Sequence, residues 1–321
     1  MLKLLFGSRS QLINFSNPLR GIKWLSSLEP HYRHGIKFYP NLDLARDVLG
    51  FTLCTNELGL RGTAQTDAAY VVLGTSFAMG MSVDEGKNWY DLALDDSLWF
   101  NAAMPVGIAN SVMLIDDLHK GKRDTLVYLY HPNVWRISES YHAAYKEGKT
   151  IFAKQGWKTD IISVLRLYPK WVLKELIKWV TGKALYCQWD EKQFHFDTTY
   201  NAFNLDQRRR QFSLEQMGLL NGLFSTFNKV VVVRVPIKED SVPLTKKTKA
   251  LRKLRAGYDE MWSFFKDNIN KDVVCSSLDH AEFSSDHFHP YDTHWNDFGN
   301  RLFAERLKDI LIAQNIPVSG K

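Results

Sequence analysis

The sequence predicts an α/β fold: a three-layer, open and mainly parallel sheet with a helical insertion. Three short, continuous apolar runs predict buried strands at 70–73 (YVVL), 126–130 (LVYLY) and 230–235 (VVVVRV). Such runs are typical of parallel strands that are covered on both faces. Helical patterns lie between them, as at 109–119. Alternation of buried strands with helices indicates an open parallel sheet.

Composition excludes several classes of protein. The 321 residues are 45% hydrophobic and 24% charged, which excludes a disordered chain or a membrane protein with many spans. Lys and Arg number 41 against 35 Asp and Glu, and the resulting net charge of +6 fits an anionic substrate or a membrane surface better than nucleic acid. The three cysteines show no paired spacing, and the first residues lack a long apolar run. We therefore expect a cytoplasmic location, with or without peripheral contact to a membrane.

The strand rhythm divides the chain into three parts. Residues 1–50 form an N-terminal lead-in, and residues 51–135 and 229–321 form the predicted core. The strand pattern lapses over 136–228, which is helical, basic and aromatic in character. We interpret this stretch as an insertion or cap over one rim of the sheet.

Within that stretch, residues 169–181 predict an amphipathic helix that begins at Pro169. Lys170, Lys174 and Lys178 make one stripe, and large apolar side chains cover the remaining surface. Such a helix either lies on a membrane surface or grips a lipid-linked substrate, or it simply packs on its own core.

The first predicted strand leads into a candidate nucleophile. The segment GTSFAMG (74–80) follows the strand and is expected to open a helix, which would place Ser76 near backbone N–H groups. In a parallel sheet the site lies beyond the carboxyl ends of the strands. The same rim would therefore hold Asn133, after the second strand, and the residues after Pro236.

A second group of candidates lies near the C-terminus, in YDTHWNDFG (291–299). Side chains two residues apart in an extended segment point the same way, so Asp292 and His294 can face one pocket. A carboxylate in this position would set the tautomer of an imidazole that serves as a base. Asn296 has the character of an N-cap for the helix that follows.

Taken together, these blocks resemble the SGNH (GDSL-type) hydrolase superfamily. The resemblance rests on TNELGLRG (55–62), on GTSFAMG with Asp84, Glu85 and Trp89 behind it, on KVVVVRVPIKED (229–240) and on the late DTHWNDFG. It covers about residues 50–135 and 229–312, and it is closest to members associated with carbohydrate O-acetyl esterase or O-acetyltransferase chemistry. The fold that it implies is of the SGNH or flavodoxin-like type.

The resemblance implies a role for each site residue. Ser76 is the nucleophile, His294 the general base and Asp292 its orienting carboxylate, while Asn133 and Gly107 are the oxyanion donors. The implied reaction is acyl transfer through serine on an O-acyl, chiefly O-acetyl, ester of a carbohydrate or glycan, by an esterase or an O-acyltransferase. It needs no cofactor and no metal, apart from acetyl-CoA or another acyl donor in a transferase. The expected partners are an anionic or lipid-linked glycan and a membrane surface touched through 169–181, with no nucleic acid.

Two other hypotheses remain open. Thr75 stands where the superfamily usually has Asp, and Val106 where a glycine is expected, which would suit an inactive scaffold that binds glycan or membrane. Alternatively, the C-terminal segment DHAEFSSDHFHPYDTHW would hold a metal for a metal-dependent hydrolase. Its candidate ligands are His280, Asp286, His287, His289, Asp292 and His294.

Overall fold

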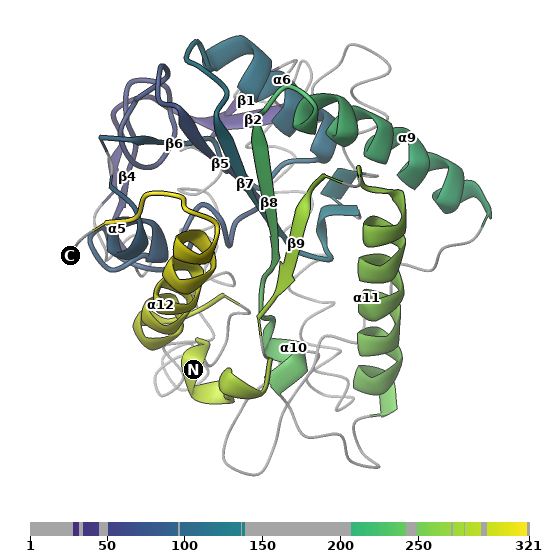
Figure 1. Cartoon of the computed structure of the whole chain (residues 1–321). Coiled ribbons are helices and arrows are strands. Elements are labelled where there is room, and N and C mark those ends of the chain that lie inside the picture. The colour runs from purple at the N-terminus through teal and green to yellow at the C-terminus, as the bar shows by residue number, and fades with distance from the viewer. Residues whose placement is uncertain are drawn as a thin grey trace, which may run out of the picture.

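A five-stranded parallel sheet forms the centre of the computed structural model (Figure 1). The structure describes residues 28–31, 35–44, 51–95, 97–135, 137–138, 207–241, 249–270, 272–278, 280–289 and 294–319. The strands, in their order across the sheet, are β6 (Trp99–Asn101), β5 (Tyr70–Gly74), β7 (Thr125–Tyr130), β8 (Lys229–Arg234) and β9 (Val274–Ser277). Every neighbouring pair runs parallel, which confirms the expected α/β class.

Helices cover both sides of this sheet. Their bounds are α5 (Trp89–Ala93), α6 (Ile108–Leu118), α9 (Gln207–Phe224), α10 (Lys238–Ser241), α11 (Lys249–Asn268) and α12 (Asp297–Ala313). The chain passes from β5 to β6 in one direction and then returns past β5 to β7. Right-handed crossovers therefore place α5 on one face and α6, α9 and α11 on the other. Contacts agree, because α12 packs on α5 and α6 packs on α9, and Figure 1 shows the two groups apart.

The three apolar runs form the three central strands, as predicted. All six residues of β7 are buried, and β5 and β8 are buried except at their first residue. The helix expected at 109–119 is α6. The edge strands β6 and β9 were not predicted, because they have only three and four residues and β9 alternates between half-buried and exposed positions.

Two small antiparallel sheets precede the central one. Strand β1 (Leu28–His31) pairs with β2 (Gly35–Phe38), and β3 (Asp43–Leu44) pairs with β4 (Leu53–Cys54). The loop after β4 reaches the core at Leu60 and β2 reaches it at Phe38, and both side chains are fully buried. These elements pack against the same core as the parallel sheet.

The predicted insertion is described only at its edges. Residues 207–224 form α9, which belongs to the β7–β8 connection and packs on α6. The amphipathic stretch 169–181 lies outside the described residues. The division into lead-in, core and insertion stays a prediction. Among the described helices, none is both long and apolar enough to cross a membrane.

The buried hydroxyl of Tyr128, on β7, should lower the stability of the fold. Its ring is buried against Phe224 and Phe265, with centroid separations of 5.8 and 6.1 Å, and its hydroxyl has no hydrogen-bond partner among the described residues. Burying an unpaired hydroxyl costs free energy. We expect Tyr128→Phe to raise the free energy of unfolding by about 1 kcal/mol, measured by urea denaturation. A loss of stability would contradict this account.

Candidate active site

Ser76 and His294 meet at the carboxyl edge of the sheet. The Ser76 Oγ lies 2.8 Å from the His294 Nε2, although 218 residues separate the two along the chain. This distance is that of a good hydrogen bond. With the hydroxyl donating to Nε2, the imidazole is placed to take the serine proton, which is the first requirement of an activated nucleophile. Both side chains are half-buried, so part of each is accessible to solvent.

A glycine at the end of β5 lets the serine segment turn tightly over β7. A Cβ on Gly74 would lie 2.6 Å from the Ala78 Cβ and 2.8 Å from the Leu129 carbonyl oxygen. Both distances are shorter than real Cβ contacts, so any side chain here would push the turn off the neighbouring strand. The close approach places Ser76 directly above the sheet edge.

The helix expected to open after Gly74 is not formed, and this corrects the sequence-based expectation. The Met79 N–H donates to the Thr75 carbonyl and the Met81 N–H to the Ser76 carbonyl, both at 3.0 Å, and the chain then leaves the turn at Gly80, where φ is +72°. Residues 75–82 are a run of turns, and the first helix, α5, begins only at Trp89. Ser76 is therefore presented by a compact loop.

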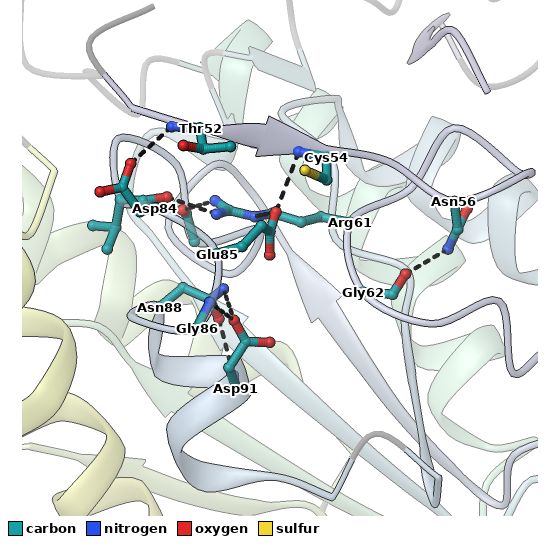
Figure 2. Close-up of polar contacts among 12 residues, drawn as sticks. Thr52, Cys54, Asn56, Arg61, Gly62, Asp84, Glu85, Gly86, Asn88 and Asp91 are labelled. Carbon is teal, nitrogen blue, oxygen red and sulfur yellow. Dashed lines mark hydrogen bonds and ion pairs between the residues drawn. The ribbon is translucent and has the colours of Figure 1, made fainter. Parts of the chain in front are cut away.

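The buried guanidinium of Arg61 binds the backbone of that loop. Arg61 is 2% exposed, and its Nη1 and Nη2 donate to the carbonyl oxygens of Gly80 and Val83, the latter at 2.6 Å. Its Nε lies 2.7 Å from the Glu85 Oε1 (Figure 2). Burial raises the pKa of Glu85, and the charge of Arg61 opposes that shift. Because one side chain binds the loop at three points, it sets the path of the chain after Ser76.

The acidic residues of the same loop tie it to the N-terminal strands. The Asp84 Oδ1 accepts a hydrogen bond from the Thr52 N–H at 2.8 Å, and the Glu85 Oε1 accepts one from the Cys54 N–H at 3.3 Å (Figure 2). The Asp91 carboxylate accepts from the Gly86 N–H at 2.6 Å. Asp84 and Glu85 thus support the serine loop and do not take part in its hydrogen bond to His294.

The histidine half of the site is held by aromatic packing. Trp295 is buried, its Nε1 donates to the Pro236 carbonyl at 3.0 Å, and its ring stacks on Phe303 with centroids 4.3 Å apart. On the other strand of an antiparallel bridge, Phe288 pairs with Trp295, and the His289 N–H donates to the His294 carbonyl at 3.0 Å. His294 is therefore anchored by its own neighbour in sequence.

The N-cap predicted at Asn296 is confirmed. Its Oδ1 accepts from the N–H groups of Phe298 and Gly299 at the start of α12, and its Nδ2 donates to the Asp286 and Phe288 carbonyls. The cap joins α12 to the segment that pairs with Trp295. This polar junction holds the histidine in register with the helix that follows it.

Asn300, which the sequence did not single out, links α12 to α5. Its Oδ1 accepts from the Trp89 N–H at 3.0 Å, and the residue is 1% exposed. The sequence feature that could have indicated this contact is an asparagine one turn inside an amphipathic helix. This bond connects the helix after His294 to the helix after the serine loop.

Phe77 lies between two imidazoles. Its ring centroid is 4.6 Å from that of His131 and 4.8 Å from that of His294. His131 is buried directly after β7, and burial, followed by the nearby charges of His294 and Arg234, lowers its pKa to about 3. Its Nδ1 accepts the Asn133 N–H at 3.0 Å. His131 is thus a neutral acceptor beside the site, a role that only its contacts reveal.

Of the three other predicted site residues, Asn133 and Gly107 lie in the described part of the chain. Asn133 is half-buried at the end of β7, and its Oδ1 accepts from the Tyr258 hydroxyl at 3.3 Å. Gly107 is the N-cap of α6, after β6, where a Cβ would lie 2.8 Å from the Ser138 Cα. In the described part of the chain, no hydrogen bond joins either residue to Ser76. Asp292 lies outside the described residues.

The C-terminal histidines do not form a metal site within the described residues. No group of three or more His, Cys, Asp or Glu side chains in that part of the chain is arranged to hold a metal ion. Two of the candidate ligands meet serine hydroxyls: His294 meets Ser76, and the His287 Nδ1 lies 3.1 Å from the Ser284 Oγ. The metal hypothesis stays a prediction for the segment that includes Asp292.

Comparison with known proteins adds no family assignment. No model of a protein family matches the sequence, and a search of curated proteins finds no significant match.

Removal of the Arg61 guanidinium should loosen the serine loop and destabilise the fold. Arg61→Met leaves two buried carbonyl oxygens without their donor and takes the cation from half-buried Glu85, and we expect these losses to cost about 3 kcal/mol. As a matched control, Arg306→Met removes an exposed guanidinium that pairs with Glu282 at 2.5 Å, where we expect a loss of about 1 kcal/mol at most. Urea denaturation measures both, and equal losses would contradict a special role for Arg61.

Burial of neutral His131 should make stability depend on pH. The unfolded imidazole has a pKa near 6.5 and the folded one about 3, so the unfolded state binds the proton first as the pH falls. The stabilisation from neutral His131 is complete above pH 6.5 and is lost towards pH 3, at up to about 1.4 kcal/mol per pH unit.

His131→Asn tests this pH dependence, because its Oδ1 can accept the same N–H without titrating. We expect the variant to lose less stability than the wild type on acidification, measured by urea denaturation between about pH 4.5 and 7. Parallel pH profiles for the two proteins would refute the assignment.

Proposed function

We propose that the chain is a serine-dependent acyl-transfer enzyme of the SGNH type, acting on O-acetyl or related O-acyl esters of a carbohydrate. The observation that carries the proposal is the 2.8 Å hydrogen bond between the Ser76 Oγ and the His294 Nε2. A serine hydroxyl paired with an imidazole is the arrangement that activates serine for attack on an ester carbonyl.

The place of this pair in the sheet supports the proposal. The order β6-β5-β7-β8-β9 reverses direction between β5 and β7. In open parallel sheets, ligands bind beyond the carboxyl ends of the strands at such a switch point, because the connections there leave in opposite directions. Ser76 follows β5 and Asn133 follows β7, so both stand beside this point.

The proposed reaction has two halves. The Ser76 Oγ attacks the ester carbonyl carbon while His294 takes the hydroxyl proton, and the tetrahedral intermediate then expels the sugar oxygen, which receives that proton from His294. An acyl-serine remains. In the second half, His294 takes a proton from water or from an acceptor hydroxyl, which attacks the acyl carbon. The bond between that carbon and the Ser76 Oγ then breaks, and His294 returns the proton to Oγ, which restores the free serine. Water makes the enzyme an esterase, and a second sugar hydroxyl makes it an O-acyltransferase.

The other residues have supporting roles in this proposal. Asp292 would hold the Nδ1–H of His294. The Asn133 side chain, the Ser76 N–H and the Gly107 N–H would stabilise the oxyanion, for which one donor contributes on the order of 10²–10³ in rate. The choice of a carbohydrate ester rests on the SGNH resemblance of the early serine block and the late D-x-H-W-N motif. The net charge of +6 suits an anionic glycan.

The test is covalent labelling by a fluorophosphonate probe together with hydrolysis of p-nitrophenyl acetate. We expect wild-type protein to be labelled and active, and Ser76→Ala to lose labelling and at least about 10³-fold in rate. The chain offers a matched control in Ser284→Ala, because Ser284 also lies beside an imidazole, at 3.1 Å, but on the exposed surface. That variant should keep both labelling and activity.

The outcomes separate the hypotheses. Acceleration of p-nitrophenol release by an added glycan acceptor would favour a transferase, and unchanged release would favour an esterase. A folded wild-type protein that neither labels nor hydrolyses the ester would refute the enzyme and favour a binding scaffold. Labelling that survives in Ser76→Ala but disappears in Ser284→Ala would move the nucleophile to the surface pair.

A further inference from the structure

The backbone of Asn133 is held on both sides. Its N–H donates to the Nδ1 of buried His131 at 3.0 Å, and its carbonyl accepts from the Ile137 N–H at 3.0 Å. His131 is in turn stacked on Phe77, the residue next to Ser76. Asn133 is therefore tied to the serine loop by a short chain of contacts, and its backbone has little freedom to move.

The side chain of Asn133 is held by a different element. The Tyr258 hydroxyl, on α11, donates to the Asn133 Oδ1 at 3.3 Å. The oxygen and nitrogen of a carboxamide lie in one plane with the carbon that bears them, and they point to either side of the bond that joins this carbon to the rest of the side chain. Because Oδ1 is directed to Tyr258 on α11, the Nδ2 donor points to the other side of the Cβ–Cγ bond.

Tyr258 is a rigid support for this bond. It is 3% exposed, and one turn further along α11 Trp262 packs against Tyr130 on β7, with ring centroids 5.0 Å apart. Tyr130 is itself fixed, since its hydroxyl accepts from the Trp135 Nε1 at 2.9 Å. The strand that carries Asn133 and the helix that carries Tyr258 are thus packed together.

We infer that Tyr258 is a positioning residue, whose hydroxyl orients the Asn133 carboxamide so that Nδ2 donates to the oxyanion formed on attack by Ser76. The inference rests on the proposed function and extends it to a residue that does not touch substrate. Oxyanion donors act only when they are already aimed at the developing charge, and misplacement by about 1 Å can cost up to about 10²-fold in rate. An unrestrained carboxamide would rotate and lose that aim.

A double-mutant cycle on p-nitrophenyl acetate hydrolysis tests the inference. We expect Tyr258→Phe to lower kcat about ten-fold with KM within about two-fold, because the interaction strengthens only in the transition state. We expect Asn133→Ala to lower kcat by on the order of 10²–10³. Adding Tyr258→Phe to Asn133→Ala should then change kcat by less than about two-fold, because the group that Tyr258 orients is gone.

Tyr128→Phe is the matched control, since it also removes one buried aromatic hydroxyl, on β7, and should leave kcat unchanged. The side-chain amide signals of Asn133, assigned by their disappearance in Asn133→Ala, give a second readout by ¹H–¹⁵N NMR. They should shift and broaden in Tyr258→Phe and stay in place in Tyr128→Phe. This readout does not depend on activity, and thermal unfolding checks that each variant is folded.

Several results would overturn the inference. Wild-type kcat in Tyr258→Phe, or an equal loss in the presence and absence of Asn133, would remove the positioning role while leaving the serine enzyme intact. Parallel losses of thermal stability and kcat in both backgrounds would make Tyr258 merely structural. Failure of the wild type to label or hydrolyse would instead refute the proposed function, and unchanged Asn133 amide signals in Tyr258→Phe would refute the hydrogen bond itself.

Discussion

The parallel pairing of β5 with β7 is the constraint on which the site depends. Both strands are almost entirely buried and pair in register over five residues, from Tyr70 opposite Thr125 to Gly74 opposite Leu129. Parallel strands end at the same edge, so the residues that follow each strand must emerge side by side. That requirement brings the turn of Ser76 next to the turn of Asn133, and the strand order reverses at the same place.

The two halves of the site are built in different ways. The serine half is a loop whose path is set by a glycine contact with β7 and by the buried guanidinium of Arg61. The histidine half is a short segment held by the packing of Trp295 and by the cap at Asn296. Phe77 touches both imidazoles and the Trp295 ring, so it is the packing element that the two halves share.

Much of the frame could be predicted from the sequence, and the reasons for the rest are physical. Long apolar runs predicted β5, β7 and β8 because central parallel strands are buried on both faces, whereas β6 and β9 are short edge strands without such a signal. The segment after Gly74 was expected to be a helix and is a turn. Its small residues do not show that Arg61, outside the segment, binds its backbone. The stacking of His131 on Phe77 and the bond of Tyr258 to Asn133 join residues far apart in the chain, which no local pattern contains.

Buried polar groups gather at this edge of the sheet, and their cost explains what they do. Arg61, His131 and Asn300 are each at most 5% exposed. Arg61 and Asn300 each make a hydrogen bond to the backbone of another segment, and His131 accepts the N–H of Asn133 in its own turn. Apolar side chains would pack the same layers without the free-energy cost of removing these polar groups from water. Stability alone therefore does not explain why polar residues stand at these positions. These groups fix the position and orientation of the segments that they bind, because a hydrogen bond depends on distance and angle. Apolar contact requires only that a segment is shielded from water. The proposed reaction requires Ser76 and His294 at hydrogen-bond distance, and such bonds fix the position of the chain on both sides of that pair.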